Sequence, residues 1–187
     1  MQTRATPATA TPLEHFNTAR PEEAAQALLA CLGSRAWAHR LTAHRPYPDL
    51  PALLAAADEA AYDLTPEDLA EALATETPPS LPEDTYAAAH TALNAAHAAY
   101  ESRFGHAFVI CMDALSTDEA LNHVLAAIRS RLNNDPDDER LVAAEELRRL
   151  ARGRLTSSLG GRGAVASTAP PLTAATSAAP PRGTGKH

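Results

Sequence analysis

The eight histidines of this chain are the first residues to invite a chemical interpretation, because imidazole binds metals and transfers protons near neutral pH. His90, Asn94 and His97 follow one another at steps of four and three residues, so a helix would carry them on one face. A zinc site needs three or four converging ligands with imidazole or thiolate character, and only two imidazoles converge here. The sequence therefore predicts no metal site and favours a solvated or partly buried polar stripe.

Charged residues near the C-terminus form the second candidate. Glu146 and Arg149 are one helical turn apart and can pair, and Arg154 follows eight residues after Glu146, close to the same face. An arginine held at a helix end beside a pocket can bind a carboxylate through two hydrogen bonds. The alternative is a surface ion pair, which contributes under ~1 kcal/mol. By composition alone the surface pair is the favoured interpretation.

The elements that must position these residues are helices. Apolar residues make up 45% of the chain and aromatic residues only 4%, and much of the apolar fraction is alanine, the best helix former. Only the run from Phe108 to Cys111 has the character of a strand. Short connections between the helices indicate antiparallel neighbours. We therefore expect an all-α fold, a single-domain bundle of about seven helices.

Caps and breakers mark where these helices begin and end. Pro21 suits a first helical turn, Ser34 and Thr65 suit N-caps, and Gly105 suits a stop. The helices are expected over residues 21–33, 34–44, 51–64, 65–74, 86–104, 116–132 and 136–155. Two non-helical segments interrupt them, at residues 75–84 and 106–116. Such segments can offer free N–H groups to a ligand, although most of them are only connections.

The two ends of the chain differ in composition from its middle. Residues 1–12 are expected to form a disordered arm, residues 13–157 the domain, and residues 158–187 a disordered tail rich in Pro, Ala and Thr. A net charge of −7 argues against nucleic-acid binding. No apolar run reaches the ~18 residues of a membrane span, and no secretory signal is visible. Two cysteines far apart in sequence suit a reducing compartment, so we expect a cytoplasmic protein.

Three motifs follow one another in the second half of the chain. They are F-G-x-x-F-V-I ending at Ile110, R-L-x-N beginning at Arg131, and E-L-x-R-L-x-x-x-R-L beginning at Glu146. In this order and spacing they resemble the C-terminal half of the 2-oxo-4-hydroxy-4-carboxy-5-ureidoimidazoline (OHCU) decarboxylases. Upstream, the C-L-G-S run at Cys31, Trp37 and Arg45-Pro46 resemble the N-terminal half of that family. The resemblance covers about residues 13–157.

The resemblance implies an all-α homodimer that acts as a lyase without any cofactor. Its substrate would be OHCU, a small anionic ureidoimidazoline of urate degradation, which loses CO2 to give (S)-allantoin. The implied substrate contacts are Pro78, the backbone amides of Phe108 and Ile110, and the guanidinium of Arg154. Fixed N–H donors and a cation stabilise the negative charge that decarboxylation leaves on the ring. A general acid must then deliver a proton to one face of that ring.

The sequence departs from the family at its catalytic His-Pro motif. Where the family has A-H-P-x-[IL]-G, this chain has Glu76-Thr77-Pro78-Pro79-Ser80, so Thr77 stands in the place of the histidine. A hydroxyl does not titrate near neutral pH, and losing an acid–base group typically removes 10²–10⁴-fold in rate. Glu83 stands where the glutamate of the family's later S-x-x-E segment is expected.

Three functional hypotheses follow. The chain is a decarboxylase that uses another proton donor, with His97, His90 and Glu83 the nearest candidates by sequence. Alternatively, it is a catalytically degenerate paralogue that acts as a binding or partner subunit, or a lyase for a related small anionic substrate. All three require the amides around Phe108–Ile110 and the guanidinium of Arg154 to meet at one cavity that opens toward Thr77 and Pro78.

Overall fold

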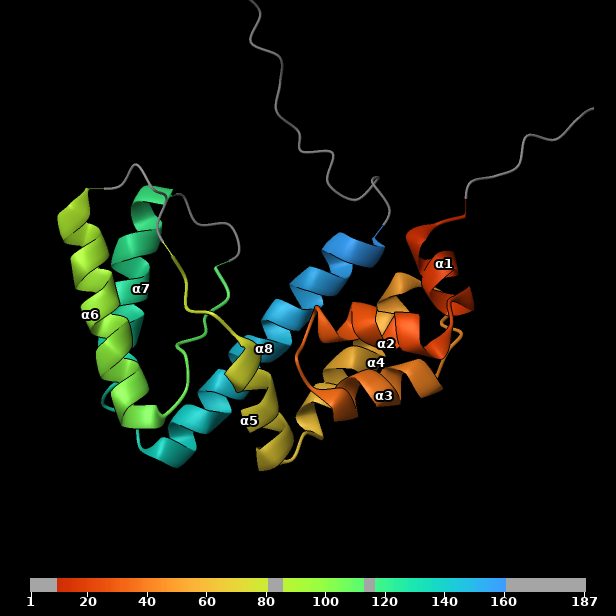
Figure 1. Ribbon diagram of the computed structural model, residues 1–187, viewed down its shortest axis with the longest axis horizontal. Coiled ribbons are helices and arrows are strands. Elements are labelled where there is room, and N and C mark those ends of the chain that lie inside the picture. Colours follow the sequence, from red (N-terminus) through yellow and green to blue (C-terminus); the bar gives the residue numbers. More distant parts are fainter. Residues whose placement is uncertain (1–9, 81–85, 113–116, 161–187) are drawn as a thin grey trace, which may run out of the picture.

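The computed structural model describes residues 10–80, 86–112 and 117–160, with only the backbone described for residues 117–119. Within these ranges the fold is all-helical, with eight helices and no strand (Figure 1), which confirms the expected fold class. The helices are α1 Pro12–Thr18, α2 Pro21–Leu29, α3 Arg35–Ala43, α4 Leu50–Tyr62, α5 Pro66–Thr75, α6 Ala87–Phe104, α7 Thr117–Arg131 and α8 Pro136–Leu159.

Three helix ends lie where the capping residues predict them, whereas α2 ends at Leu29 and does not reach residue 33 as expected. The Ser34 side chain accepts a hydrogen bond from the Trp37 amide at the start of α3, and Thr65 forms a reciprocal capping box with Asp68 at the start of α5. Gly105 ends α6 in the left-handed region at φ 76°, a conformation that glycine adopts at little cost. The capping box expected at residues 116–119 lies outside the described side chains.

Helix α1 was not expected, and it brings the count to eight. A capping box starts it, because the Thr11 hydroxyl accepts from the Glu14 amide while the Glu14 carboxylate accepts from the Thr11 amide. Phe16 on α1 is buried and anchors the helix to the core. At the other end, α8 runs to Leu159 rather than stopping at about Leu155.

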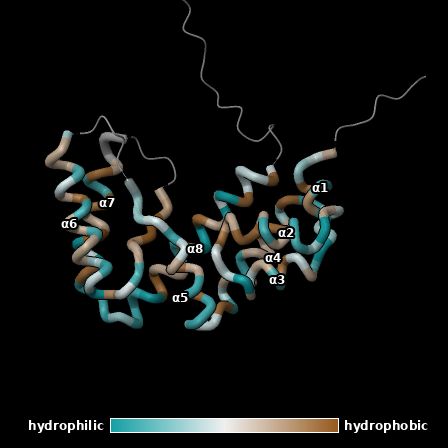
Figure 2. The backbone as a smooth tube through the Cα atoms, in the orientation of Figure 1, coloured by the Kyte–Doolittle hydropathy of each residue, from teal (hydrophilic) through white to brown (hydrophobic). Residues whose placement is uncertain are grey.

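The buried side chains form two hydrophobic clusters. The first joins α1 to α5 with the later turns of α8, and the second lies between α6 and α7. Figure 1 shows the two groups of helices on opposite sides of the molecule, with α8 crossing from one to the other. Along each helix, hydrophobic and hydrophilic residues alternate in short bands (Figure 2). In α8 the buried residues follow one another at steps of four, so this helix buries one stripe.

An extended segment, residues 106–112, connects the two clusters, and we call it the strap. Phe108 and Ile110 pack into the α6–α7 cluster, whereas Val109 between them packs into the other. This alternation is the period of two that an extended backbone imposes. The run that looked strand-like in the sequence is thus an extended segment buried between helices (Figure 1). None of the described helices combines the length and hydropathy that a membrane span requires.

Candidate active site

Arg154, on α8, is the centre of the candidate site. Its Nη1 donates to Glu76 Oε1 at 2.7 Å and to the carbonyl oxygen of Cys31 at 3.0 Å, and its Nη2 donates to Glu76 Oε2 at 2.8 Å. Two parallel hydrogen bonds to one carboxylate are the strongest geometry that a guanidinium offers. These hydrogen bonds raise the pKa of Arg154 above its usual value. The side chain is therefore a clamp for a planar carboxylate, and the chain itself supplies the carboxylate it holds.

Glu76 ties the altered motif to α8. It is the C-cap of α5, and Thr77 and Pro78 follow it directly. The Glu76 side chain is only 6% exposed, whereas that of Arg154 is 38% exposed. Thr77 itself is exposed and Pro78 is half-buried. The ion pair with Arg154 thus holds the start of the altered motif beside the guanidinium. Glu83, the other predicted site residue of this segment, lies outside the described residues.

Arg154 lines an open hollow of about 680 Å³. Its wall comes from α2 with the turn that follows it, from α8 and from the strap, and consists of Ala27, Ala30, Cys31, Cys111, Arg149, Leu150, Gly153, Arg154, Ser157 and Ser158. Cys31 and Cys111, which are far apart in sequence, therefore meet at one site. Burial raises the pKa of the Cys31 thiol, so this thiol stays protonated near neutral pH.

The strap contains two amides that donate no hydrogen bond to another described residue. Arg131 Nη1 donates to the carbonyl oxygen of Val109 at 2.6 Å. In a trans peptide the next N–H points the opposite way, so the Ile110 amide is directed away from Arg131. Within the described part of the chain, neither this amide nor that of Phe108 donates a hydrogen bond to another residue. Phe108 is fully buried and Ile110 half-buried, so of the two amides that of Ile110 is the one that a ligand could reach.

The strap reaches the hollow one residue beyond Ile110. Cys111 lines the wall beside Arg154, and its amide donates to Glu146 Oε2 at 2.7 Å. Glu146 also pairs with Arg149 at 3.4 Å, as the one-turn spacing predicted. Phe108 and Ile110 themselves are not on this wall. The structure thus brings Arg154, Glu76 and the strap together, whereas the amides of Phe108 and Ile110 are near the hollow in sequence and are not on its wall.

A buried polar network holds the strap in place. Glu139 on α8 is fully buried and accepts from Arg131 Nε at 2.7 Å, from Asn134 Nδ2 at 2.8 Å and from the Tyr100 hydroxyl. Arg131 also lies over the Phe108 ring, 4.6 Å from its centroid. Burial raises the pKa of Tyr100, so its hydroxyl remains a donor. Two residues of the R-L-x-N motif, Arg131 and Asn134, belong to this network, which gives that motif a structural role.

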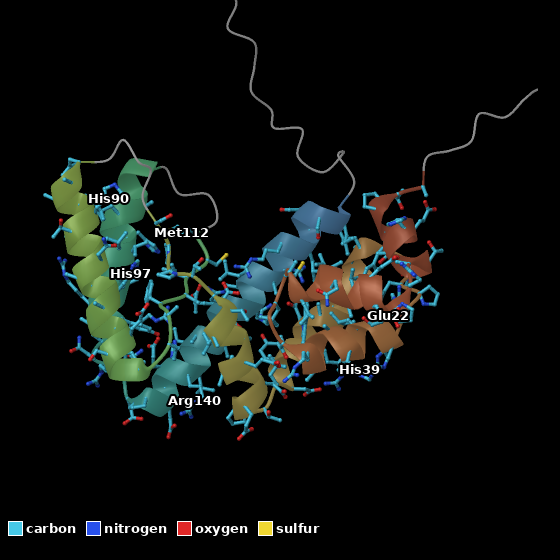
Figure 3. The ribbon with its side chains drawn as sticks, viewed as in Figure 1. Glu22, His39, His90, His97, Met112 and Arg140 are labelled. Atoms are coloured by element: carbon cyan, nitrogen blue, oxygen red, sulfur yellow. The ribbon has the colours of Figure 1, made fainter. Side chains whose placement is uncertain are left out.

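His97 lies on the strap side of α6 (Figure 3) and is stacked on Phe108 with the ring centroids 6.1 Å apart. It is 7% exposed, and its Nε2 has no hydrogen-bond partner among the described residues. Burial lowers its pKa, which favours the neutral imidazole. His97 is not on the wall of the Arg154 hollow, and His90 is half-buried farther toward the start of α6. Within the described residues no cluster of three or more potential ligands could hold a metal.

A comparison with models of protein families matches residues 17–78 and 79–156 to the family described as OHCU decarboxylase. The chain belongs to the OHCU decarboxylase family. This confirms the resemblance drawn from the sequence motifs, and the match resumes directly after Pro78 of the altered motif. No curated protein sequence matches the chain significantly.

Two solved structures share the fold of this chain. An (S)-allantoin synthase crystal structure matches with a TM-score of 0.62 and 22% identity, over 80% of this chain and 54% of the other. An OHCU decarboxylase crystallised in the presence of (S)-allantoin matches with a TM-score of 0.62 and 22% identity, over 76% of this chain and 99% of the other. The chain thus spans about half the length of the synthase chain. At this identity the likeness establishes the fold.

Sequence reasoning missed Glu76 as a site residue. The available signal was its position, since it stands where the family's A-H-P motif has alanine. An acidic side chain beside an expected anion site is a local conflict, and such conflicts point to function or to a partner elsewhere in the chain. Nothing in the sequence indicated that the partner would be Arg154.

Proposed function

We propose that this protein is an OHCU decarboxylase-like lyase that converts OHCU to (S)-allantoin and CO2 without a cofactor. The observation that carries the proposal is the Arg154 clamp, which lies at an open hollow and already binds a carboxylate through two hydrogen bonds. The substrate would be a small anionic ureidoimidazoline whose carboxylate or ring anion takes the place of Glu76. Membership of the family supports this choice of substrate.

The proposed reaction breaks the bond between the ring carbon and its carboxylate. CO2 leaves, the electron pair stays on the ring, and a proton is then added to one face of that carbon. Arg154 and the amides of Phe108 and Ile110 would stabilise the developing negative charge, with Pro78 beside them. Thr77 does not titrate near neutral pH, so it would contribute a hydroxyl contact and not the proton. We propose His97 or Glu83 as the proton donor.

The test is to generate OHCU freshly from urate and to follow its decay with and without the protein. We expect faster decay and optically active (S)-allantoin. An unchanged decay rate with racemic product would reject the proposal. If the protein is active, His97→Gln should lower kcat by 10²–10⁴-fold if His97 is the donor, whereas the same change at His39, exposed on α3 (Figure 3), should have no effect.

A second candidate function is that of a binding or partner subunit without catalysis, or of a lyase for a related small anion. Two observations favour it. Thr77 replaces the family's histidine, and Arg154 is already occupied by Glu76. Inactivity toward OHCU together with a stable complex with another enzyme of urate degradation would support the partner role.

We also propose that the protein is a cytoplasmic homodimer. The family resemblance suggests the dimer, and a groove on the surface supports it. Tyr62 and Leu141, which are 70% and 72% exposed, line this one groove between α4, α5 and α8. Large apolar side chains exposed together are typical of protein–protein contacts.

A further inference from the structure

The altered motif places a carboxylate where the family pattern has alanine. In A-H-P the first residue carries no charge, whereas here it is Glu76, whose two oxygens lie 2.7 and 2.8 Å from the Nη atoms of Arg154. The carboxylate is nearly buried, and the guanidinium is partly open to the hollow. Glu76 thus accompanies the loss of the family histidine at the next position, and its carboxylate occupies the anion site formed by Arg154.

We propose that Glu76 is a specificity-determining residue that competes with carboxylate ligands for Arg154. The inference rests on the proposed function only in taking Arg154 as the anion site. A second carboxylate would meet a guanidinium whose two Nη groups are engaged and whose charge is neutralised, and it would be repelled by Glu76. A neutral ligand of the same shape has no such competitor. The site thus discriminates against carboxylates relative to neutral ligands.

Exchange of Glu76 for a ligand requires only its side chain to move, at the cost of its two hydrogen bonds to Arg154. Arg154 keeps its hydrogen bond to the carbonyl oxygen of Cys31, so the guanidinium stays in position when Glu76 leaves. Glu76 also lines a second hollow of about 610 Å³ between α5, the end of α6 and the start of α8. Rotation of the Glu76 side chain into that hollow would leave the backbone of α5 in place.

The size of the effect follows from the population of the paired state. A ligand that binds only the form in which Arg154 is released has its apparent Kd raised by the inverse of the released fraction. If the pair is formed in about nine molecules in ten, the apparent Kd for a carboxylate is raised about tenfold. Removal of the Glu76 carboxylate should abolish this factor.

Acetate and acetamide are matched probes, because they have the same shape and differ in charge. Titration at constant ionic strength, followed through the backbone amide signals of Cys111 and Gly153 in the hollow, gives both Kd values. We expect Glu76→Ala, which restores the family's own residue, to bind acetate about tenfold or more tightly than the unmodified protein and to leave the Kd of acetamide unchanged. Glu71→Ala is the matched control, because Glu71 also lies on α5 but pairs with Arg35.

Three results would overturn the proposal. They are an unchanged Kd for acetate in Glu76→Ala, an equal gain for acetamide, and a gain that persists when Arg154→Ala is added. Glu76→Gln gives the same test if the alanine variant does not fold, with a smaller gain expected. Acetate binding needs no catalysis, so the measurement also tests the inference in a protein that has no decarboxylase activity. In an active protein, Glu76→Ala should lower the KM for OHCU. An unchanged KM would overturn the inference about Glu76 but not the proposed decarboxylase function.

Discussion

At the scale of single residues, the pair of Glu76 and Arg154 is asymmetric in burial, and the two partners should differ in what their loss costs. Arg154→Ala leaves a nearly buried carboxylate without its donors and should lower the free energy of unfolding by about 1–3 kcal/mol. Glu76→Ala should cost less, because Arg154 remains partly hydrated and bonded to Cys31. Urea denaturation of both variants measures the difference.

The double variant Glu76→Ala with Arg154→Ala provides the control for this prediction. Once the carboxylate is removed, the loss of Arg154 no longer strands a buried charge, so part of the stability should return. The prediction is wrong if the two single variants lose equal free energy of unfolding, or if the loss in the double variant is the sum of the two. Either result would show that burial of Glu76 does not affect the stability of the pair.

His97 gives a prediction for pH. Burial lowers its pKa in the folded protein, so below about pH 6.5 the unfolded chain takes up a proton more readily than the native state. The contribution of neutral His97 to stability is therefore complete above that pH and is lost as the pH falls below it. Urea denaturation at pH 7.5 and 5.5 should show a smaller acid-induced loss in His97→Leu than in the unmodified protein.

The exposed His39 serves as the comparison, because the same substitution there removes an imidazole without emptying a buried site. An acid-induced loss of equal size in His97→Leu, His39→Leu and the unmodified protein would contradict the argument from burial.

At the scale of elements, the strap depends on α7 and α8 for its conformation. Arg131 on α7 joins the Val109 carbonyl to the fully buried Glu139 on α8. Arg131→Met keeps the bulk of the side chain but strands the Glu139 charge, and loss of one partner of a buried pair typically costs about 3–5 kcal/mol. We expect a fall of this size in the free energy of unfolding, measured by urea denaturation.

Arg129→Met is the matched control on the same helix, because Arg129 is exposed and its loss should change stability by less than about 0.5 kcal/mol. Adding Glu139→Gln to Arg131→Met should recover part of the loss, since no buried charge then remains. If Arg131→Met is as mild as Arg129→Met, the network does not hold the strap.

At the scale of the whole molecule, the strap contributes to both hydrophobic clusters, and α8 contributes Leu147, Ala151 and Leu155 to the larger one. The proposed dimer would add contacts through the groove that contains Tyr62 and Leu141. Leu141→Glu introduces a charge at the centre of that surface without disturbing the core, because Leu141 is 72% exposed. We expect this change to convert a dimer to a monomer in sedimentation equilibrium.

Ala126→Glu, at an exposed position on α7, is the control and should leave the molecular mass in solution unchanged. A dimer that survives Leu141→Glu would place the interface elsewhere on the surface.

The sequence by itself determined the helices and the family. Helix ends such as Ser34, Thr65 and Gly105 follow from contacts within one turn, so their signals are local, and the T-x-x-E capping box that starts α1 is a local signal of the same kind. The strand-like character of the run from Phe108 to Cys111 was also visible in its residue types.

The tertiary structure alone decided what surrounds Arg154. Its partner Glu76 is 78 residues away in the chain, and the hollow's two cysteines come from the turn after α2 and from the strap. A charged side chain at a helix end is compatible with many partners, and local patterns do not distinguish among them. Which carboxylate reaches the guanidinium depends on how α5 and α8 pack, and that packing is set by the burial of the whole core.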